Sequence, residues 1–135
     1  MYKSYKRFIG YSTAFRQWRA GSHCSLIHGY AFCFKVWFEG ELDDKGWVID
    51  FGCFKRNGVK EWLKNMFDHT TCIAADDPEL EMFKEMDKRG IIDLRVLENG
   101  VGCEKFAELV ALYLQDIVHK ETDGRASVSK VQCWE

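Results

Sequence analysis

Large apolar side chains occupy every second position from Tyr30 to Phe38, and Lys35 is the one charged residue among the positions between them. A period of two predicts a strand with one strongly apolar face. The polar run 43–46 predicts a turn, and residues 47–50 predict a second strand that returns beside the first as an antiparallel hairpin. Residues 126–135 alternate again and predict another strand.

Apolar residues recur every three or four positions over 54–67 and 106–117, which predicts two helices, the later one with an apolar stripe that faces a sheet. Residues 77–88 predict a further helix, with Pro78 at its first position. A short strand is predicted over 91–97. The order strand, strand, helix, helix, strand, helix, strand predicts an α+β fold in which an antiparallel sheet carries its helices on one face.

The composition predicts one domain over residues 1–135, because 47% hydrophobic and 15% aromatic residues supply material for a core and no linker divides the chain. Nineteen basic against 21 acidic residues, a net charge of -2, argue against a nucleic-acid partner. No apolar stretch approaches a membrane span, and the first residues lack the apolar core of a signal peptide. A cytoplasmic protein with no nucleic-acid or membrane partner is therefore expected.

The densest chemistry lies in residues 22–30, where Cys24 stands between His23 and His28. A nearby imidazole lowers the pKa of a thiol and so supplies the reactive thiolate, and imidazoles are also good zinc ligands. The alternative interpretation is a loop that merely carries polar residues. The other thiols are interpreted as reduced, small, buried packing residues: Cys33, Cys53, Cys72, Cys103 and Cys133.

Several ordered motifs together are more specific than this cluster alone. Cys24-x-x-x-His28-Gly29 precedes the alternating strand, followed by residues 47–52, Phe67-Asp68-His69 and a glutamate at a helix start. This order resembles the family of 6-pyruvoyl-tetrahydropterin synthase and 6-carboxytetrahydropterin synthase, from about Tyr11 to the last residue. The resemblance implies the T-fold, whose subunits join their sheets into barrels, so a homo-oligomer, trimer or hexamer, is expected.

The resemblance also implies roles for individual residues. Cys24 matches the general base that acts on the side chain of dihydroneopterin triphosphate, and Asp68 with His69 matches the pair that tunes this proton transfer. Glu135 matches the carboxylate that binds the 2-amino-pyrimidinone edge of the pterin ring. Glu104 resembles a first-turn glutamate of the family. The plainer alternatives are a helix-end Asp-His pair, a frayed terminus and a carboxylate that complements a helix dipole.

The family pattern breaks at the metal ligands, which the resemblance implies are three histidines that bind zinc. Phe15 and Tyr30 stand at two of these positions, and only His28 remains. A phenyl ring cannot ligate a metal, and tyrosine ligates well only as a phenolate, so the three-imidazole site cannot form. Zinc therefore stays an open expectation: either the metal is lost or other residues bind it, with His23 the nearest candidate.

Three functions follow from these observations. The leading hypothesis is a 6-carboxytetrahydropterin synthase-like carbon–oxygen lyase, motivated by the short Cys-x-x-x-His spacing, in the pathway to 7-deazaguanine (queuosine-type) precursors. In it, Arg16 and Arg19 could supply positive charge near the triphosphate. The second is a T-fold pterin- or purine-binding protein that has lost zinc and catalysis, motivated by the replaced ligands. The third is a thiol hydrolase that uses Cys24 with His28 or His69, for which no oxyanion-hole motif is present.

Overall fold

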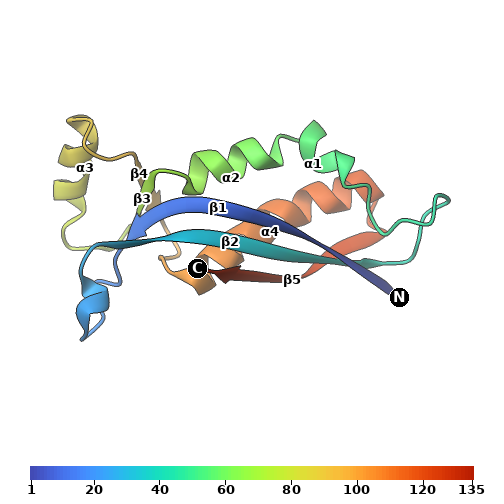
Figure 1. Cartoon of the computed structure of the whole chain (residues 1–135), viewed down its shortest axis with the longest axis horizontal. Helices are drawn as coiled ribbons and strands as arrows, with labels where there is room; N and C mark the ends of the chain where they lie inside the picture. Colours follow the sequence, from blue (N-terminus) through green and yellow to red (C-terminus); the bar gives the residue numbers. More distant parts are fainter.

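The chain forms a five-stranded sheet in the order β4-β3-β1-β2-β5, described by a computed structural model of all 135 residues (Figure 1). The strands are β1 (Tyr2–Phe15), β2 (His28–Gly40), β3 (Thr70–Ala74), β4 (Leu94–Leu97) and β5 (Ala126–Trp134). The helices are α1 (Gly52–Arg56), α2 (Val59–Phe67), α3 (Leu80–Lys88) and α4 (Cys103–Thr122), with a 3-10 turn η1 (His23–Ser25). None of the helices combines the length and apolar character needed to cross a bilayer.

The predicted α+β class, with helices on one face of the sheet, is confirmed. The sheet itself is mixed: β2 runs antiparallel to β1 and to β5. Strand β3 joins β1 in parallel, and β4 joins β3 in parallel. The sequence pattern predicted antiparallel pairing throughout, because it revealed neither β1 nor β3.

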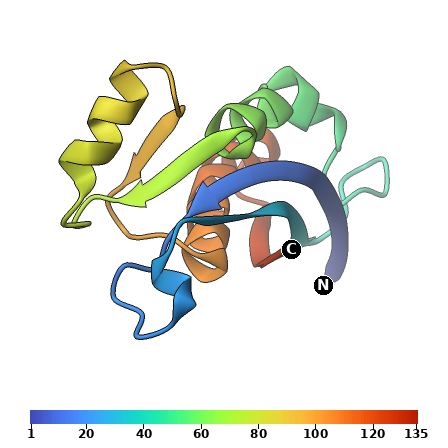
Figure 2. The same ribbon diagram turned by 60° about the vertical axis from the view of Figure 1, so that its left-hand side comes forward.

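The core lies between the sheet and helices α1, α2 and α4 (Figures 1 and 2). Every second residue in the middle of β2 is fully buried: Phe32, Phe34, Val36 and Phe38. Every fourth residue of α4 faces them and is also fully buried: Phe106, Val110, Leu114 and Val118. These two periods match across the interface, so the predicted strand and the predicted helical stripe are both confirmed.

Strand β1 escaped the sequence analysis because its alternation changes phase. A register shift against β2 lies between Ile9 and Tyr11, at Gly10, whose φ is +89°. Before this bulge an even-numbered residue, Phe8, is buried, whereas after it the buried residues are odd-numbered, as at Phe15. A bulge adds one residue to one strand and thereby moves every later side chain to the other face, which hides the period of two.

The predicted hairpin is wrong in its second strand. Residues 47–50 form no strand, and β2 pairs instead with β1 and β5. The turn was predicted correctly: the Asp43 carboxylate accepts the N–H groups of Lys45 and Trp47, each at 2.9 Å. Val48 is buried against the core, so its apolar character reflects packing of a loop rather than a strand.

The predicted helix over 54–67 is two helices, α1 and α2. Asn57 donates its side-chain N–H to the Cys53 carbonyl at 2.8 Å, and Gly58 follows with φ of +65°. Glycine tolerates this left-handed conformation, which ends one helix before the next begins.

The remaining expectations hold in position but differ in length. The helix expected over 77–88 begins at Leu80, because Asp77 binds side chains and the Glu79 N–H before the first turn. The strand expected over 91–97 shortens to β4, and the strand over 126–135 is confirmed as β5. Strand β3 was missed because all five of its residues are buried, which removes any alternation.

A buried ion pair connects the end of β1 to the segment before α3. The Arg16 Nε donates to Asp77 Oδ2 at 2.8 Å and its Nη2 donates to Oδ1 at 2.5 Å. The Asp77 side chain is 1% exposed and that of Arg16 is 19% exposed. The hydrogen bonds from Arg16 lower the pKa of Asp77, and the Glu79 N–H lowers it further.

We expect Asp77→Ala to lower the free energy of unfolding by about 3 kcal/mol at neutral pH, because it leaves the Arg16 guanidinium unpaired. The folded-state pKa of Asp77 lies below its unfolded value, so this stabilisation is complete above about pH 4 and is lost as the pH falls through the folded-state pKa. Urea unfolding at several pH values measures both effects.

Asp76→Ala is the matched control, because Asp76 pairs with Arg19 at the surface, where the two side chains are 61% and 73% exposed. This variant is expected to lose less than about 1 kcal/mol. If Asp77→Ala lost as little stability as Asp76→Ala, or if its loss of stability stayed constant as the pH fell, the stabilising role of the Arg16–Asp77 pair would be contradicted.

Candidate active site

Cys24 lies in the loop between β1 and β2, which projects from one end of the sheet (Figure 2). Ser22 shapes this loop: its Oγ accepts the Cys24 N–H at 3.3 Å, and its carbonyl accepts the Ser25 hydroxyl at 2.9 Å. The thiol takes no part in these bonds and is half-buried. The loop therefore holds its shape without the sulfur atom.

Gln17 connects the Cys24 loop to the start of α4. Its backbone N–H donates to the Cys24 carbonyl at 2.9 Å, and its side-chain amide donates to the Val101 carbonyl at 2.9 Å. A Cβ at Gly102, where φ is +117°, would lie 2.3 Å from the Gln17 Nε2. Gln17 was missed from the sequence; the sole signal was a glycine directly before a helix, where the backbone conformation and the amide exclude any side chain.

An aromatic cluster stands where the resemblance implies three zinc ligands. Phe15 lies opposite His28 in the β1–β2 register, with ring centroids 4.6 Å apart. The rings of His28 and Tyr30 are 5.5 Å apart and nearly perpendicular, and those of Phe15 and Tyr30 are 6.4 Å apart. Phe106 packs edge-on against Phe15 at 5.6 Å. The three positions therefore share one corner, but they offer one imidazole, one phenol and one hydrocarbon ring.

These residues do not fit zinc. Nowhere in the chain do three or more His, Cys, Asp or Glu side chains gather as a metal site. His23, the nearest alternative ligand, is exposed in η1. Structural and catalytic zinc sites need at least three protein ligands, so His28 alone does not make one.

Asp68 and His69 attach to β1 just before β3. The Ser12 N–H donates to Asp68 Oδ1 at 3.1 Å, and the His69 Nδ1 lies 3.2 Å from the same oxygen. The bond from Ser12 is the main cause that lowers the pKa of Asp68. His69 is 84% exposed and has φ of +58°, with its N–H donated to the Ser12 carbonyl at 2.7 Å. No hydrogen bond or shared hollow joins this pair to Cys24 within one chain.

Glu104 and Glu135 flank a pair of thiols at the start of α4 and the end of β5. Burial is the main cause that raises the pKa of both Cys103 and Cys133. The negative charges of the two glutamates, both exposed, also raise the pKa of Cys103. These two thiols are only half-buried, whereas the other three expected packing thiols are buried: Cys33, Cys53 and Cys72.

Arg16 and Arg19, which the sequence analysis considered for a triphosphate, both have carboxylate partners. Arg16 binds Asp77 as described, and the Arg19 Nη2 donates to Asp76 Oδ2 at 2.8 Å. Neither guanidinium is a free cation in this chain.

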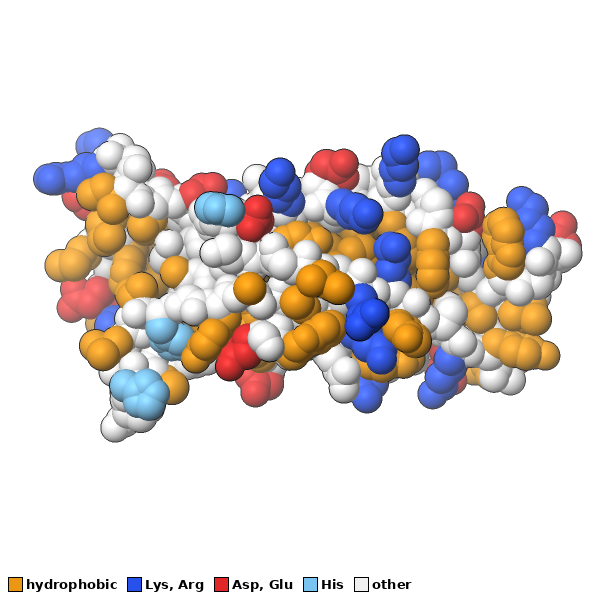
Figure 3. Space-filling model, in the orientation of Figure 1, with side chains coloured by type: hydrophobic (Ala, Val, Ile, Leu, Met, Phe, Trp, Pro, Cys, Tyr) orange, Lys and Arg blue, Asp and Glu red, His pale blue; other side chains and the backbone are white.

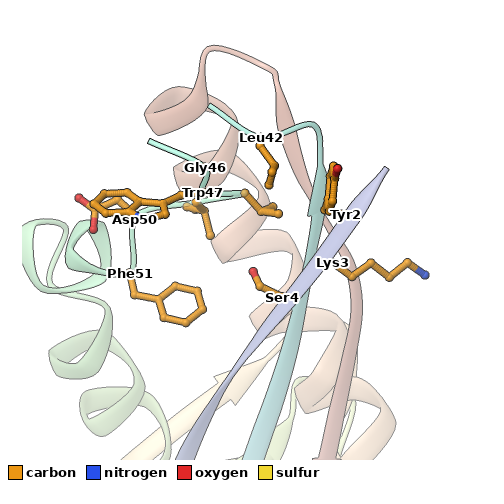
Figure 4. Close-up of a pocket in the computed structure, with 10 residues that line it drawn as sticks. Tyr2, Lys3, Ser4, Leu42, Gly46, Trp47, Asp50 and Phe51 are labelled. Carbon is orange, nitrogen blue, oxygen red and sulfur yellow. The ribbon is translucent and has the colours of Figure 1, made fainter. Parts of the chain in front are cut away.

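The largest hollow lies at the other end of the sheet, about 540 Å³ in volume, between the start of β1 and residues 42–51 (Figure 4). Ser4 and Phe51 project into it, and its wall contains none of the predicted site residues. In the face shown in Figure 3, by contrast, histidine side chains gather at the end that carries the Cys24 loop. The predicted site residues and the largest hollow therefore lie at different ends of the sheet, as expected if one chain supplies only part of a site.

The sequence model of the 6-pyruvoyl tetrahydropterin synthase family matches residues 4–135. The chain belongs to this family. The family membership predicted from Cys24, His28 and the later motifs is thereby confirmed.

Two relatives carry the name of one branch of the family. A 6-carboxy-5,6,7,8-tetrahydropterin synthase from Rickettsia felis is 34% identical over 58 residues, which are 42% of this chain and 41% of that protein. A probable enzyme of the same name from Halobacterium salinarum is 30% identical over 107 residues, which are 78% of this chain and 65% of that protein. The matched part spans less than two thirds of either relative.

Solved structures agree on the fold. An uncharacterized protein from Wolinella succinogenes superposes with a TM-score of 0.82 at 19% identity, covering 99% of this chain and 92% of its own. The 6-pyruvoyl tetrahydropterin synthase from Plasmodium falciparum superposes with a TM-score of 0.60 at 15% identity, covering 98% of both chains. At such identities the likeness concerns the fold alone, and the expected T-fold is confirmed.

Proposed function

We propose that this chain is a pterin synthase of the 6-carboxytetrahydropterin type, which converts dihydroneopterin triphosphate to 6-carboxytetrahydropterin for 7-deazaguanine precursors. The observation that carries the proposal is the double contact of Gln17, which holds the Cys24 loop against the start of α4. The Cys24 loop is thereby kept beside the start of α4, whose first turn carries Glu104. The names of the Rickettsia and Halobacterium relatives support the same branch.

In this proposal each polar residue has one task. Cys24, as thiolate, takes a proton from a carbon of the substrate side chain, and triphosphate leaves. Water is consumed, the two outer side-chain carbons leave as acetaldehyde, and the carbon next to the ring becomes the 6-carboxyl group. The Glu135 carboxylate accepts two N–H groups from the pyrimidinone edge of the pterin ring, a bidentate match that selects guanine-like rings. Glu104 binds the same ring system from the first turn of α4. No step uses a metal, because the ligand positions do not fit one.

Asp68 and His69 act in this proposal from a neighbouring subunit. The pair is exposed and does not meet Cys24 in its own chain, which favours a site completed at a subunit boundary. Strands of the sheet also have unpaired sides: β1 pairs with β3 only over Thr13–Phe15, so most of its length has a neighbour on one side alone, and the edge strand β5 has one neighbour. Open edges invite further strands, so a trimer or hexamer that closes the sheets into a barrel is proposed.

Turnover of dihydroneopterin triphosphate by the purified protein tests the proposal. Release of triphosphate with formation of 6-carboxytetrahydropterin is expected, at the same rate with chelator and with added zinc. A folded protein that releases neither product under either condition would contradict it.

The replaced ligand positions favour one alternative, a T-fold protein that binds a pterin or purine without converting it. Phe15 and Tyr30 motivate this alternative, since the site lacks the donors of a catalytic metal. Calorimetric titration with neopterin and guanine distinguishes the two functions. Binding without turnover supports the alternative, and no binding argues against both.

We expect Glu135→Gln to weaken neopterin binding roughly 10- to 100-fold, because an amide cannot accept two N–H groups with the strength of a carboxylate. Glu108→Gln on α4 is the matched control: Glu108 pairs only with Lys105 at the surface, so affinity should not change. Calorimetry measures both variants. Equal affinity of Glu135→Gln and the original chain would show that the Glu135 carboxylate does not bind the ligand.

A further inference from the structure

Two polar groups that together offer a hydrogen-bond acceptor and a donor lie side by side on β2. The His28 Nδ1 lies 2.7 Å from the Leu26 carbonyl oxygen, which can only accept, so Nδ1 carries the proton. In the tautomer that donates through Nδ1, the lone pair lies on Nε2, which can accept a hydrogen bond. The Tyr30 ring stands 5.5 Å away, is 41% exposed, and its hydroxyl bonds to no other group of the chain. It is free to donate.

We propose that His28 and Tyr30 form a metal-free site that binds adjacent hydroxyl groups of the ligand. Each alcohol both donates and accepts, so an acceptor beside a donor complements a polyhydroxylated chain. The proposal rests on the proposed function: in a pterin ligand the hydroxyls are those of the side chain next to the ring.

Phe15 makes this corner selective for an organic ligand rather than a cation. Its ring, 5% exposed, lies 4.6 Å from that of His28 and fills the third position of the corner with hydrocarbon. Phe32 and Phe106 pack behind it at 5.6 Å each. A metal would therefore meet a single imidazole, whereas a hydroxyl group meets an imidazole, a phenol and a rigid apolar wall.

Metal content provides a test that does not depend on activity. The original chain, exposed to excess zinc and desalted, is expected to retain far less than one equivalent, and the Cys24→Ala variant the same. The double substitution Phe15→His with Tyr30→His places three imidazoles at one corner and should retain about one equivalent per chain. Cobalt absorption would report the new coordination. One equivalent of zinc in the original chain would overturn the proposal.

Ligand selectivity tests the hydroxyl contacts directly. Calorimetry compares neopterin, with its trihydroxypropyl side chain, with pterin, which has none. Tyr30→Phe should weaken neopterin binding roughly two- to tenfold, as for one neutral hydrogen bond, and leave pterin binding unchanged. Tyr2→Phe, at the far end of the sheet, is the matched control and should change neither.

The outcomes separate the two proposals. An original chain that binds neopterin and pterin equally, or a Tyr30→Phe variant that weakens both alike, overturns the hydroxyl site and leaves the proposed pterin function standing. An original chain that binds neither compound overturns the pterin function and the hydroxyl site with it. Neopterin binding that chelator abolishes and zinc restores overturns the metal-free site alone.

Discussion

Cys24→Ala is expected to lower kcat for dihydroneopterin triphosphate by about 100- to 10,000-fold, the range that a general base contributes. The folded state should be unaffected, because the loop is held by Ser22 and Gln17 through bonds that do not involve the sulfur. A discontinuous assay of carboxypterin, with urea unfolding of the same preparations, measures both quantities.

Cys72→Ala is the control, which is expected to change stability and not kcat. Cys72 is fully buried in β3, and burial raises the pKa of its thiol to about 11, so it carries no reactive thiolate at neutral pH. This variant should lose roughly 1–2 kcal/mol of stability and keep its kcat. A Cys24→Ala variant that folds and retains kcat within a factor of about three would remove Cys24 from the chemistry, and one that loses its fold would indicate a structural thiol.

Phe106→Ala is expected to lower the free energy of unfolding by about 3–5 kcal/mol, the cost of a large cavity in a packed core. Phe106 is fully buried and packs edge-on against three rings, at 5.6 Å from Phe15, 5.3 Å from Phe32 and 5.3 Å from Phe67. The same ring supports Phe15 behind His28, so neopterin affinity should fall as well. Urea unfolding and calorimetry measure the two effects.

Leu112→Ala on the same helix is the control, because Leu112 is 61% exposed and its loss should cost less than about 0.5 kcal/mol. Similar stabilities for the two variants would show that the aromatic cluster around Phe106 does not hold the sheet to α4. A large loss of stability with unchanged neopterin affinity would separate the core from the site.

The sequence predicted those elements whose apolar period runs unbroken. Strand β2 and helix α4 bury their apolar positions at periods of two and four, and both were identified. Strand β1 was lost because the bulge at Gly10 inverts its pattern, and residues 47–50 were misassigned because an apolar loop and a strand look alike. In each error a tertiary contact, not a local preference, decided the conformation.

The candidate site, like the fold, was predictable only where its residues lie close together in the sequence. The Cys24 loop and the replaced ligand positions could be identified from residue types in one short segment, and the structure brings Phe15, His28 and Tyr30 together. The role of Gln17 could not be identified, because its two partners lie 7 and 84 positions away along the chain. Local sequence carries no trace of such long-range hydrogen bonds.

A crystal structure of the chain with neopterin tests the central claim most directly, because it locates the ligand at one end of the sheet or the other. The proposed function and the metal-free hydroxyl site together predict the pterin ring on the Glu135 carboxylate, side-chain hydroxyls facing Tyr30, and no metal density beside His28. Neopterin in the hollow beside Trp47 at the opposite end, or a metal ion bound at His28, would contradict it.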